Sequence, residues 1–357
     1  MGSVLRIVVG KFVNTLITLA IATAIITAVF SYQSLQTLQL NAEEELQGWI
    51  LQMYRQGRPP TDEQIEMMRQ ALYEQYGLDR SFIEWTFIYL RKLLVLDLGN
   101  TRTPFIGGST LVKDQLMLAL KNTVILFMTA LLIQTFIGLL VGLFIATRPG
   151  GLLDKFISLY GMVSYSLPSW WLGILAIYYF SFKLGWFPSS LKDVYFQVSQ
   201  IQSVGFMAVM EKLRLWIYYL TLPVSVIVLS SIGAWAYLVR NIVIGVMQED
   251  FVTVTRAKGL PERKTLYGHV LRTSSPPIVT YIALSMVFTL GGAIITEAVF
   301  NWPGMGLIYW VALLQGEAPL LIGATYVLTV LFLLVYYVTD LLYALLDPRV
   351  RLGGQSG

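Results

Sequence analysis

Long apolar segments alternate with shorter polar ones along almost the whole of this chain. Six of the apolar segments are long enough to cross a bilayer as helices, which takes about 20 residues each. The pattern therefore predicts an all-α polytopic membrane protein with six transmembrane helices. The predicted spans are residues 12–30, 123–147, 156–182, 215–239, 277–296 and 319–343.

A long polar segment, residues 31–122, follows the first predicted span. It is too polar to insert into a membrane, yet it has the pattern of folded helices. Thr61 and Gln64 have the spacing of a capping box, and apolar residues then recur at helical intervals as far as Gly77. We therefore expect a small helical insertion outside the membrane, on the extracytoplasmic side.

A second polar segment, residues 249–272, separates the fourth and fifth predicted spans. Glu249 and Asp250 stand where the N-terminus of a helix favours acidic residues, and Gly259 can adopt the left-handed conformation that ends a helix. Pro261 suits the first position of a following helix. The pattern predicts two short helices that meet at Gly259 and form a compact knob. An ordinary basic loop is the alternative interpretation.

These elements predict a simple domain organisation with a single membrane-embedded body. We find no internal repeat that would indicate two fused copies of this body. The expected parts are a first transmembrane helix at 1–30, the insertion at 31–122, a five-helix membrane core at 123–346 that contains the loop 240–276, and a tail at 347–357.

Composition and charge support this class and orient the chain. Hydrophobic residues make up 56% of the chain and charged residues only 13%, against roughly 25% charged residues in soluble domains. Basic residues gather on one side of the predicted spans, and the positive-inside rule places that side, with both termini, in the cytoplasm. They are Arg6 and Lys11, Arg148 and Lys155, the basic residues of the loop from Arg240 to Arg272, and Arg349 and Arg351.

Several kinds of chemistry are excluded by what the sequence lacks. It has no cysteine and one histidine, His269, so disulfides, thiol chemistry and Cys/His metal sites are not expected. No phosphate-binding loop of the form G-x-x-x-x-G-K-[ST] is present, so we expect no ATP hydrolysis by that route. Glu297 and Asp340 lie near the ends of predicted spans, and the central parts hold no ionisable residue of the kind that proton-coupled carriers use.

Three serines near Pro168 in the third predicted span suggest a nucleophile, and with it an intramembrane hydrolase. They are Ser164, Ser166 and Ser169. No histidine, lysine or aspartate in the spans is available to activate them. The better interpretation is that these hydroxyl groups satisfy backbone groups around the proline. The hydrolase is therefore a weak alternative.

The polar segment 255–272 carries a resemblance to a known family. Its sequence, TRAKGLPERKTLYGHVLR, resembles the cytoplasmic coupling loop of ATP-binding-cassette (ABC) importer permeases of the dipeptide/oligopeptide class. Further segments are similar to motifs of the same family, in the same order, over nearly the whole chain. These are residues 62–79, DLGNT at 97–101, SLPSWWLG at 166–173, EAVFNWPGMG at 297–306 and LYALLDPRVR at 342–351.

The resemblance implies the fold of a type I ABC importer transmembrane domain and the function of a permease subunit in the plasma or inner membrane. Such a subunit forms half of a membrane pathway for peptides or similar oligomeric solutes, which in this family include oligosaccharides. The implied partners are a second homologous permease chain, two ABC ATPase subunits or domains, an extracytoplasmic solute-binding protein and membrane lipid, with no nucleic acid. ATP and Mg would bind to the ATPase partners and no cofactor to this chain. A stand-alone channel or secondary carrier is the alternative.

The resemblance also implies roles for particular residues. ATPase coupling falls to Thr255, Arg256, Ala257, Lys258, Gly259 and Leu260. A translocation path is expected along Ser164, Ser166, Ser169, Trp170, Gly291 and Gly292. The outer gate, or the contact with the binding protein, falls to Glu297, Trp302, Pro303 and Gly304.

Two departures from the family pattern are visible. The P-G-D-P turn that is common after the first span is missing here, where residues 31–39 stand instead. Thr253 and Thr255 occupy positions in the coupling loop where Arg and Ala are common. The first connection and the packing of the loop helix are therefore the places where this chain is expected to differ from the family.

Overall fold

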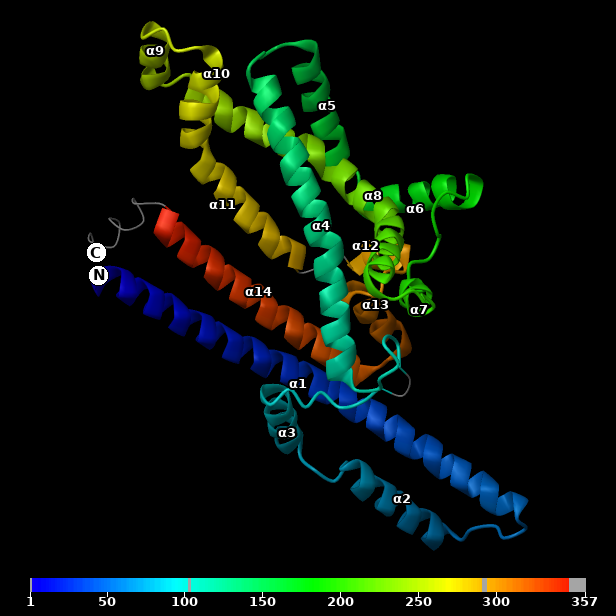
Figure 1. The fold of residues 1–357 in the computed structure, drawn as a ribbon. Coiled ribbons are helices and arrows are strands. Elements are labelled where there is room, and N and C mark those ends of the chain that lie inside the picture. The colour runs from blue at the N-terminus through cyan, green and yellow to red at the C-terminus, as the bar shows by residue number, and fades with distance from the viewer. Residues whose placement is uncertain (1, 102–103, 291–293, 347–357) are drawn as a thin grey trace. The chain divides into compact units, whose positions relative to one another are not determined.

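The computed structural model describes residues 2–101, 104–290 and 294–346, which fold almost entirely into helices (Figure 1). Within these residues the one β pairing is an isolated antiparallel bridge between Asn100 and Leu111. The chain forms two compact units. The first unit comprises Met1–Val13, Met117–Trp310 and Leu331–Gly357, and the second comprises Asn14–Leu116 and Val311–Val330.

The helices of the described residues include two π-helical segments, η1 and η2. The elements are α1 (Gly2–Arg55), α2 (Asp62–Tyr76), α3 (Phe82–Leu94), α4 (Val112–Ala146), α5 (Leu152–Ser166), α6 (Ser169–Ala176), η1 (Ile177–Lys183), α7 (Val194–Ser199), α8 (Gly205–Met247), α9 (Asp250–Ala257), α10 (Glu262–Lys264), η2 (Thr265–Val270), α11 (Leu271–Leu290), α12 (Ile294–Phe300), α13 (Met305–Gln315) and α14 (Ala318–Leu346).

Among the described residues, four helical stretches are long and apolar enough to cross a membrane. They coincide with the first, second, fourth and sixth predicted spans, so those predictions are confirmed by length and composition. The stretches are Val8–Tyr32, Val112–Ala146, Gly205–Met247 and Ala318–Thr339.

The third predicted span, 156–182, is not one continuous helix. α5 ends at Ser166, and Leu167 is extended, with φ −95° and ψ 125°. A residue that precedes proline is sterically disfavoured in the helical region, and Pro168 itself has no N–H to donate. The chain therefore leaves the helix at Leu167 and resumes as α6 and η1.

The fifth predicted span, 277–296, is divided between α11 and α12. Residues 291–293 between these two helices lie outside the described part of the chain. Gly291 and Gly292, expected in the translocation path, fall there, so the structure adds nothing to that expectation.

In the second unit the predicted helical insertion is present, but it does not start where the first span was expected to end. α1 continues without a break past residue 30 to Arg55. The capping box of α2 is confirmed, since Thr61 and Gln64 bond reciprocally. Leu72 of α2 is buried in a cluster with Ala42 and Leu46 of α1, so the insertion packs against the extension of the first helix.

Within the first unit, α5 packs closely along α8 through two glycines. A Cβ atom at Gly161 would lie 2.8 Å from the backbone carbon of Gly233. Beyond this crossing, Arg240 of α8 donates hydrogen bonds to both carboxylate oxygens of Asp154, at 2.8 and 2.7 Å. These bonds from the guanidinium group lower the pKa of Asp154. Small residues thus permit the close approach and a bidentate ion pair fixes its register.

The glycine crossing predicts opposite effects for two alanine substitutions. Gly161→Ala should lower the stability of the purified chain by about 1–3 kcal/mol, because the added methyl group meets backbone atoms. Gly245→Ala on α8 should leave stability unchanged or raise it by up to about 1 kcal/mol, since nothing lies within 4 Å of its Cβ position. Thermal unfolding in detergent measures both. A loss of similar size in both variants would contradict close packing at Gly161.

Candidate functional site

The predicted knob is confirmed in its first half. Glu249 is the N-cap of α9 and has extended backbone angles. At the other end Gly259 has φ 78°. Its N–H donates to the carbonyl of Arg256 at 2.9 Å, and the N–H of Leu260 donates to the carbonyl of Thr255 at 3.3 Å. These two bonds form a Schellman motif, which ends α9 at the glycine.

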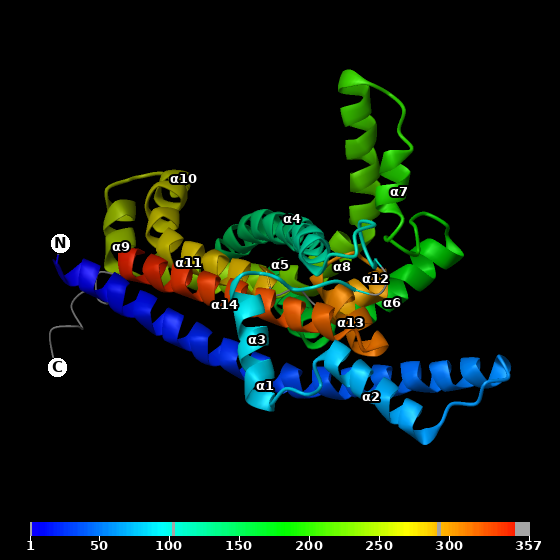
Figure 2. The ribbon, with the colours of Figure 1, turned by 90° about the horizontal axis from the view of Figure 1, so that it is seen from below.

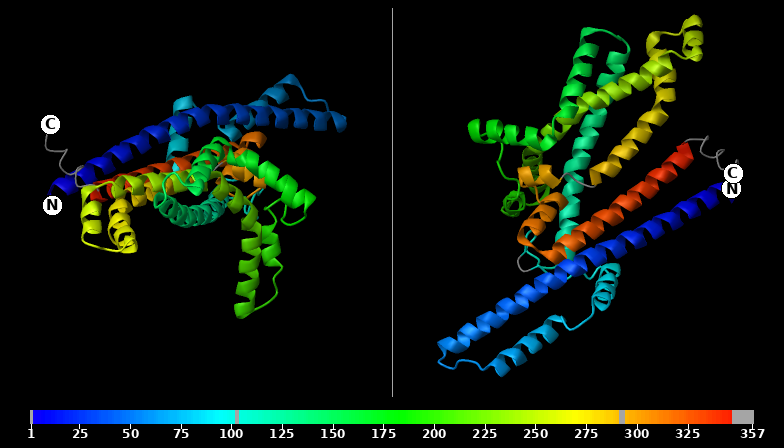
Figure 3. Two further views of the ribbon diagram at one scale, coloured as in Figure 1. Left: turned by 90° about the horizontal axis from the view of Figure 1, so that it is seen from above. Right: turned by 180° about the vertical axis from the view of Figure 1, so that it is seen from behind.

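The second half of the knob differs from the prediction of a separate short helix. Pro261 is the N-cap, one position before the first helical residue. α10, η2 and α11 then follow one another without a break from Glu262 to Leu290. The knob is therefore one short helix, α9, joined by the four residues 258–261 to the start of the long helical segment that leads into the fifth predicted span. Figure 2 and Figure 3 show α9 and α10 side by side at that end of α11.

Two neighbouring apolar side chains, the buried Val252 and the partly buried Phe251, attach α9 to the rest of the first unit. Val252 is completely buried, in a cluster with residues of α4, α8, η2 and α11 that include Leu143, Val243, Val270 and Ile278. Most other residues of α9 are exposed, including Val254, which is 50% exposed. The helix thus has one buried point of attachment and a broad outer surface with an apolar residue on it.

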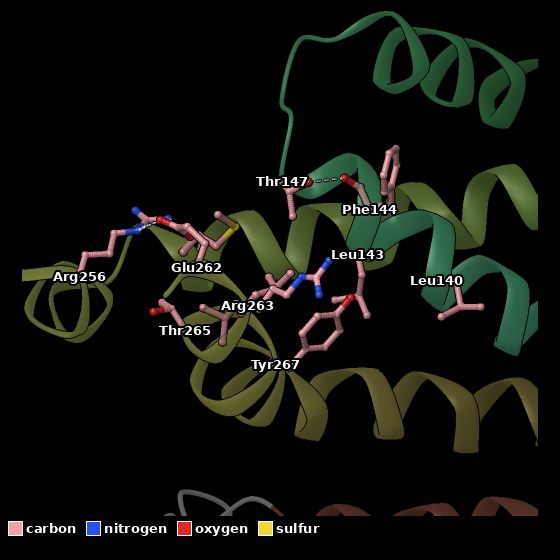
Figure 4. Close-up of a pocket in the computed structure, with 12 residues that line it drawn as sticks. Leu140, Leu143, Phe144, Thr147, Arg256, Glu262, Arg263, Thr265 and Tyr267 are labelled. Carbon is pink, nitrogen blue, oxygen red and sulfur yellow. Dashed lines mark hydrogen bonds and ion pairs between the residues drawn. The ribbon is translucent and has the colours of Figure 1, made fainter. Parts of the chain in front are cut away.

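The six expected coupling residues all lie at the end of α9, but not all offer free polar groups. Thr255 donates its hydroxyl to the carbonyl of Val252 at 2.7 Å. Arg256 forms an ion pair with Glu262 at 2.9 Å, across the turn (Figure 4). Both partners are well exposed, so this pair stabilises the turn by at most about 1 kcal/mol. Ala257, Lys258 and Gly259 are exposed, and Leu260 is partly buried.

A network of hydrogen bonds surrounds the buried side chain of Glu297 in α12. Its carboxylate is completely buried. It accepts a hydrogen bond from the hydroxyl of Thr123 at 2.7 Å and from the backbone N–H of Gly306 at 2.6 Å. The N–H of Met305 in turn donates to the Thr123 hydroxyl at 2.8 Å. A carboxylate at the first turn of α13 is favoured by the unpaired N–H groups and the dipole of the helix.

Hydrogen bonds next to Glu297 also hold the turn between α12 and α13 to α4. The indole N–H of Trp302 donates to the carbonyl of Asn122 at 3.1 Å, and the Asn122 amide donates to the carbonyl of Pro303 at 2.6 Å. At Gly304 an added Cβ would lie 2.4 Å from a carboxylate oxygen of Glu297, so no larger residue fits without displacing it. The part of α4 around Asn122 and Thr123 is therefore joined to the turn before α13.

The residues that the resemblance implies for the outer gate or the binding-protein contact belong to this buried turn. Glu297, Trp302, Pro303 and Gly304 are all buried, so their side chains do not present a surface to a binding protein in this structure. The sequence analysis missed Asn122 and Thr123, which satisfy these buried groups. A signal for them was available in the sequence, because two adjacent polar residues stand where the second predicted span begins. A buried carboxylate such as that of Glu297 needs hydrogen-bond donors nearby, and such residues can supply them.

The expected path residues are not brought onto one surface. The Ser164 hydroxyl is buried and donates to the carbonyl of Gly161, whereas Ser166 is exposed and donates to the carbonyl of Met162. The interpretation that these hydroxyl groups satisfy the backbone is confirmed for both. Ser169 lies 3.0 Å from the Thr296 hydroxyl of α12.

The last expected path residue among the described ones, Trp170, is partly buried.

Comparison with known proteins identifies the class. Residues 138–352, more than half of the chain, match the family of the binding-protein-dependent transport system inner membrane component, and the chain belongs to that family. It is therefore a multi-pass membrane permease of a transport system, and its helical fold is that of a type I ABC importer transmembrane domain.

Two relatives illustrate the similarity. The chain is 30% identical over 298 residues to the di/tripeptide transport system permease protein DppB of Pseudomonas aeruginosa, a match that covers 80% of this chain and 85% of the relative. It is 27% identical over 286 residues to the oligopeptide transport system permease protein AppB of Bacillus subtilis, with 79% and 85% covered.

The Glu297 network predicts a graded loss of stability. Glu297→Ala leaves the Gly306 N–H and the Thr123 hydroxyl without their acceptor and should cost about 1–3 kcal/mol or more. Glu297→Gln should cost less, because its carbonyl oxygen still accepts from one donor. Thermal unfolding of the purified chain gives the order, with Glu74→Ala, an exposed carboxylate of α2, as the control. Equal stability of Glu297→Ala and the control would show that the hydrogen bonds of Glu297 do not stabilise the fold.

Proposed function

We propose that this chain is one of two related permease subunits of an ATP-driven importer. Two cytoplasmic ATPase subunits or domains would bind ATP and Mg, and an extracytoplasmic binding protein would deliver the solute. Family membership supports the general assignment. The observation that carries the coupling role is α9, whose outer surface is free while its buried Val252 belongs to a cluster shared with α4, α8 and α11.

The mechanism follows from this attachment. The exposed end of α9, around Arg256 to Leu260, would lie in a groove of the ATPase, where Val254 offers apolar contact and Lys258 a positive charge. Closure of the ATPases on ATP would displace α9. Because a packed apolar cluster resists deformation, the displacement would move the three membrane helices as well, and the pathway would change from inward-open to outward-open.

The orientation belongs to the same proposal. The basic residues at the N-terminus, between the second and third predicted spans, and in the coupling loop support a cytoplasmic position for these parts. Both termini would then be cytoplasmic and residues 31–122 largely extracytoplasmic.

Peptides are the proposed substrates, because the relatives described above are named as permeases for oligopeptides and for di- and tripeptides. Oligosaccharides are the second candidate. The path would run between the two permease chains, with Ser169, Trp170, Gly291 and Gly292 as candidate lining residues. The buried turn at Glu297, Trp302, Pro303 and Gly304 would support the outer gate from behind.

The proposal is tested by purifying the tagged chain from its native membrane in mild detergent and identifying what accompanies it. We expect a second six-span chain and a P-loop ATPase, with ATP hydrolysis raised by a peptide-loaded binding protein and not by an oligosaccharide-loaded one. Recovery of the chain alone, with solute flux in liposomes that contain no ATP, would instead establish a stand-alone carrier or channel.

Replacing Gly259 by valine should uncouple ATP hydrolysis from uptake. A non-glycine residue in the left-handed region costs about 1–2 kcal/mol, and a β-branched one more, so the end of α9 would be distorted. Gly259→Asn is the matched control, because asparagine tolerates this conformation better. Uptake and ATPase activity are measured in the same vesicles. Normal uptake by the valine variant would refute the role of the glycine turn.

Reversing the charge of Lys258 should weaken attachment of the ATPase. Lys258 is exposed at the end of α9, and a glutamate there would replace attraction to acidic groups of the partner by repulsion. Lys155→Glu, an exposed reversal on the same predicted side, is the control. In a quantitative pull-down we expect several-fold less ATPase with the Lys258 variant alone. Unchanged recovery would mean that the contact is apolar.

A further inference from the structure

A pocket of about 490 Å³ lies between the end of α4 and the segment formed by α10 and η2. Its walls are of two kinds. Apolar side chains of α4 and η2, among them Leu140, Phe144 and Leu266, form one part, and polar side chains of the coupling loop form the other (Figure 4). None of the residues implied to form the solute path or the outer gate lines it.

The apolar part of the pocket is continuous with the outer surface of a membrane helix. Leu140 is 52% exposed and Phe144 51% exposed. Both belong to the stretch Val112–Ala146, which is long enough to cross the bilayer. Such a surface is covered by lipid chains when the helix is in a membrane, so the pocket opens towards hydrocarbon on this side.

The polar part of the pocket carries an excess positive charge. Arg256 and Glu262 neutralise each other in their ion pair. Arg263 has no ion pair among the residues that the structure describes, and Figure 4 shows its guanidinium group directed between α4 and η2, where the hydroxyl end of Tyr267 also points. Arg148 does not line the pocket, but its guanidinium carbon lies 5.5 Å from the centre of the ring of Phe144, which does.

An apolar wall that faces hydrocarbon, next to free guanidinium and phenol groups at the end of a membrane helix, matches one kind of molecule. Phospholipid acyl chains fit the first part, and an anionic headgroup fits the second, since arginine binds phosphate oxygens through paired N–H donors. Basic pockets between membrane helices on the cytoplasmic side are sites for such headgroups. A free phosphate ion would leave the apolar wall uncovered.

We infer that this pocket, bounded by Leu140, Phe144, Arg263 and Tyr267, is a binding site for an anionic phospholipid of the cytoplasmic leaflet. The placement in that leaflet rests on the proposed orientation. Because the walls belong to α4 and to the segment that follows α9, a bound lipid ties the coupling loop to a membrane helix. Under the proposed function, anionic lipid would therefore tighten coupling between ATP hydrolysis and uptake.

The test uses the full chain in nanodiscs of phosphatidylcholine with a minor fraction of photoactivatable phosphatidylglycerol. Labelling should concentrate on peptides that contain residues 140–147 and 263–270. Arg263→Gln should reduce it about fivefold, the effect of removing one basic residue near a charged headgroup. Lys264→Gln is the matched control, because it removes the same charge from the next residue, which is exposed and does not line the pocket. It should leave labelling unchanged.

Unchanged labelling of Arg263→Gln would overturn the inference, and so would each of four further outcomes. One is an equal loss of labelling in both variants, which indicates general surface attraction. Equal labelling by a photoactivatable phosphatidylcholine would show an unselective apolar groove, and loss of labelling on addition of inorganic phosphate would show a phosphate site. Loss of labelling in the assembled complex would show that the second permease occupies the pocket.

The labelling assay requires no ATPase, so its result is independent of the proposed function. If Arg263→Gln loses lipid while no ATPase ever co-purifies, the lipid site stands and the importer assignment fails. If the ATPase attaches and labelling is unchanged by Arg263→Gln, the importer stands and the lipid site fails.

Discussion

The burial of Val252 is the contact on which the working parts of the first unit depend. This fully buried side chain, with the partly buried Phe251 beside it, holds α9 in a cluster that includes Leu143 of α4, Val243 of α8 and Ile278 of α11. Dense packing makes such a cluster move as a body, so a short loop helix is tied to three membrane helices. The same arrangement leaves most of the other residues of α9 exposed. One helix can therefore be both rigidly attached and accessible.

The network around Glu297 achieves rigidity by polar means. A buried carboxylate is costly unless its hydrogen bonds are satisfied. Here Thr123 and the N–H groups at the start of α13 satisfy it, and Gly304 leaves the room that it needs. Because these donors belong to α4 and α13, the carboxylate fixes two helices to one turn. The turn between α12 and α13 is thereby fixed to α4.

Local chemistry explains what could be predicted. The capping box at Thr61, the start of α9 at Glu249 and its end at Gly259 follow from rules that act within a few residues, and the structure confirms each. The break at Pro168 follows from an equally local rule. Hydropathy alone nevertheless predicted a single span across Pro168, because the apolar composition continues on both sides of the break. The continuation of α1 to Arg55 was also missed, because hydropathy detects only the apolar stretch and the helix extends beyond it.

Sequence alone determined the membrane class, four of the long helices, the glycine turn after α9 and the family, because apolar length, caps and motifs are all encoded locally. Only the tertiary structure decided which groups meet. It paired Glu297 with Thr123, joined Asn122 to Pro303, and placed Arg263 beside the apolar face of α4. These outcomes depend on how distant helices pack, and packing is set by the shapes of many side chains together, which no single segment contains.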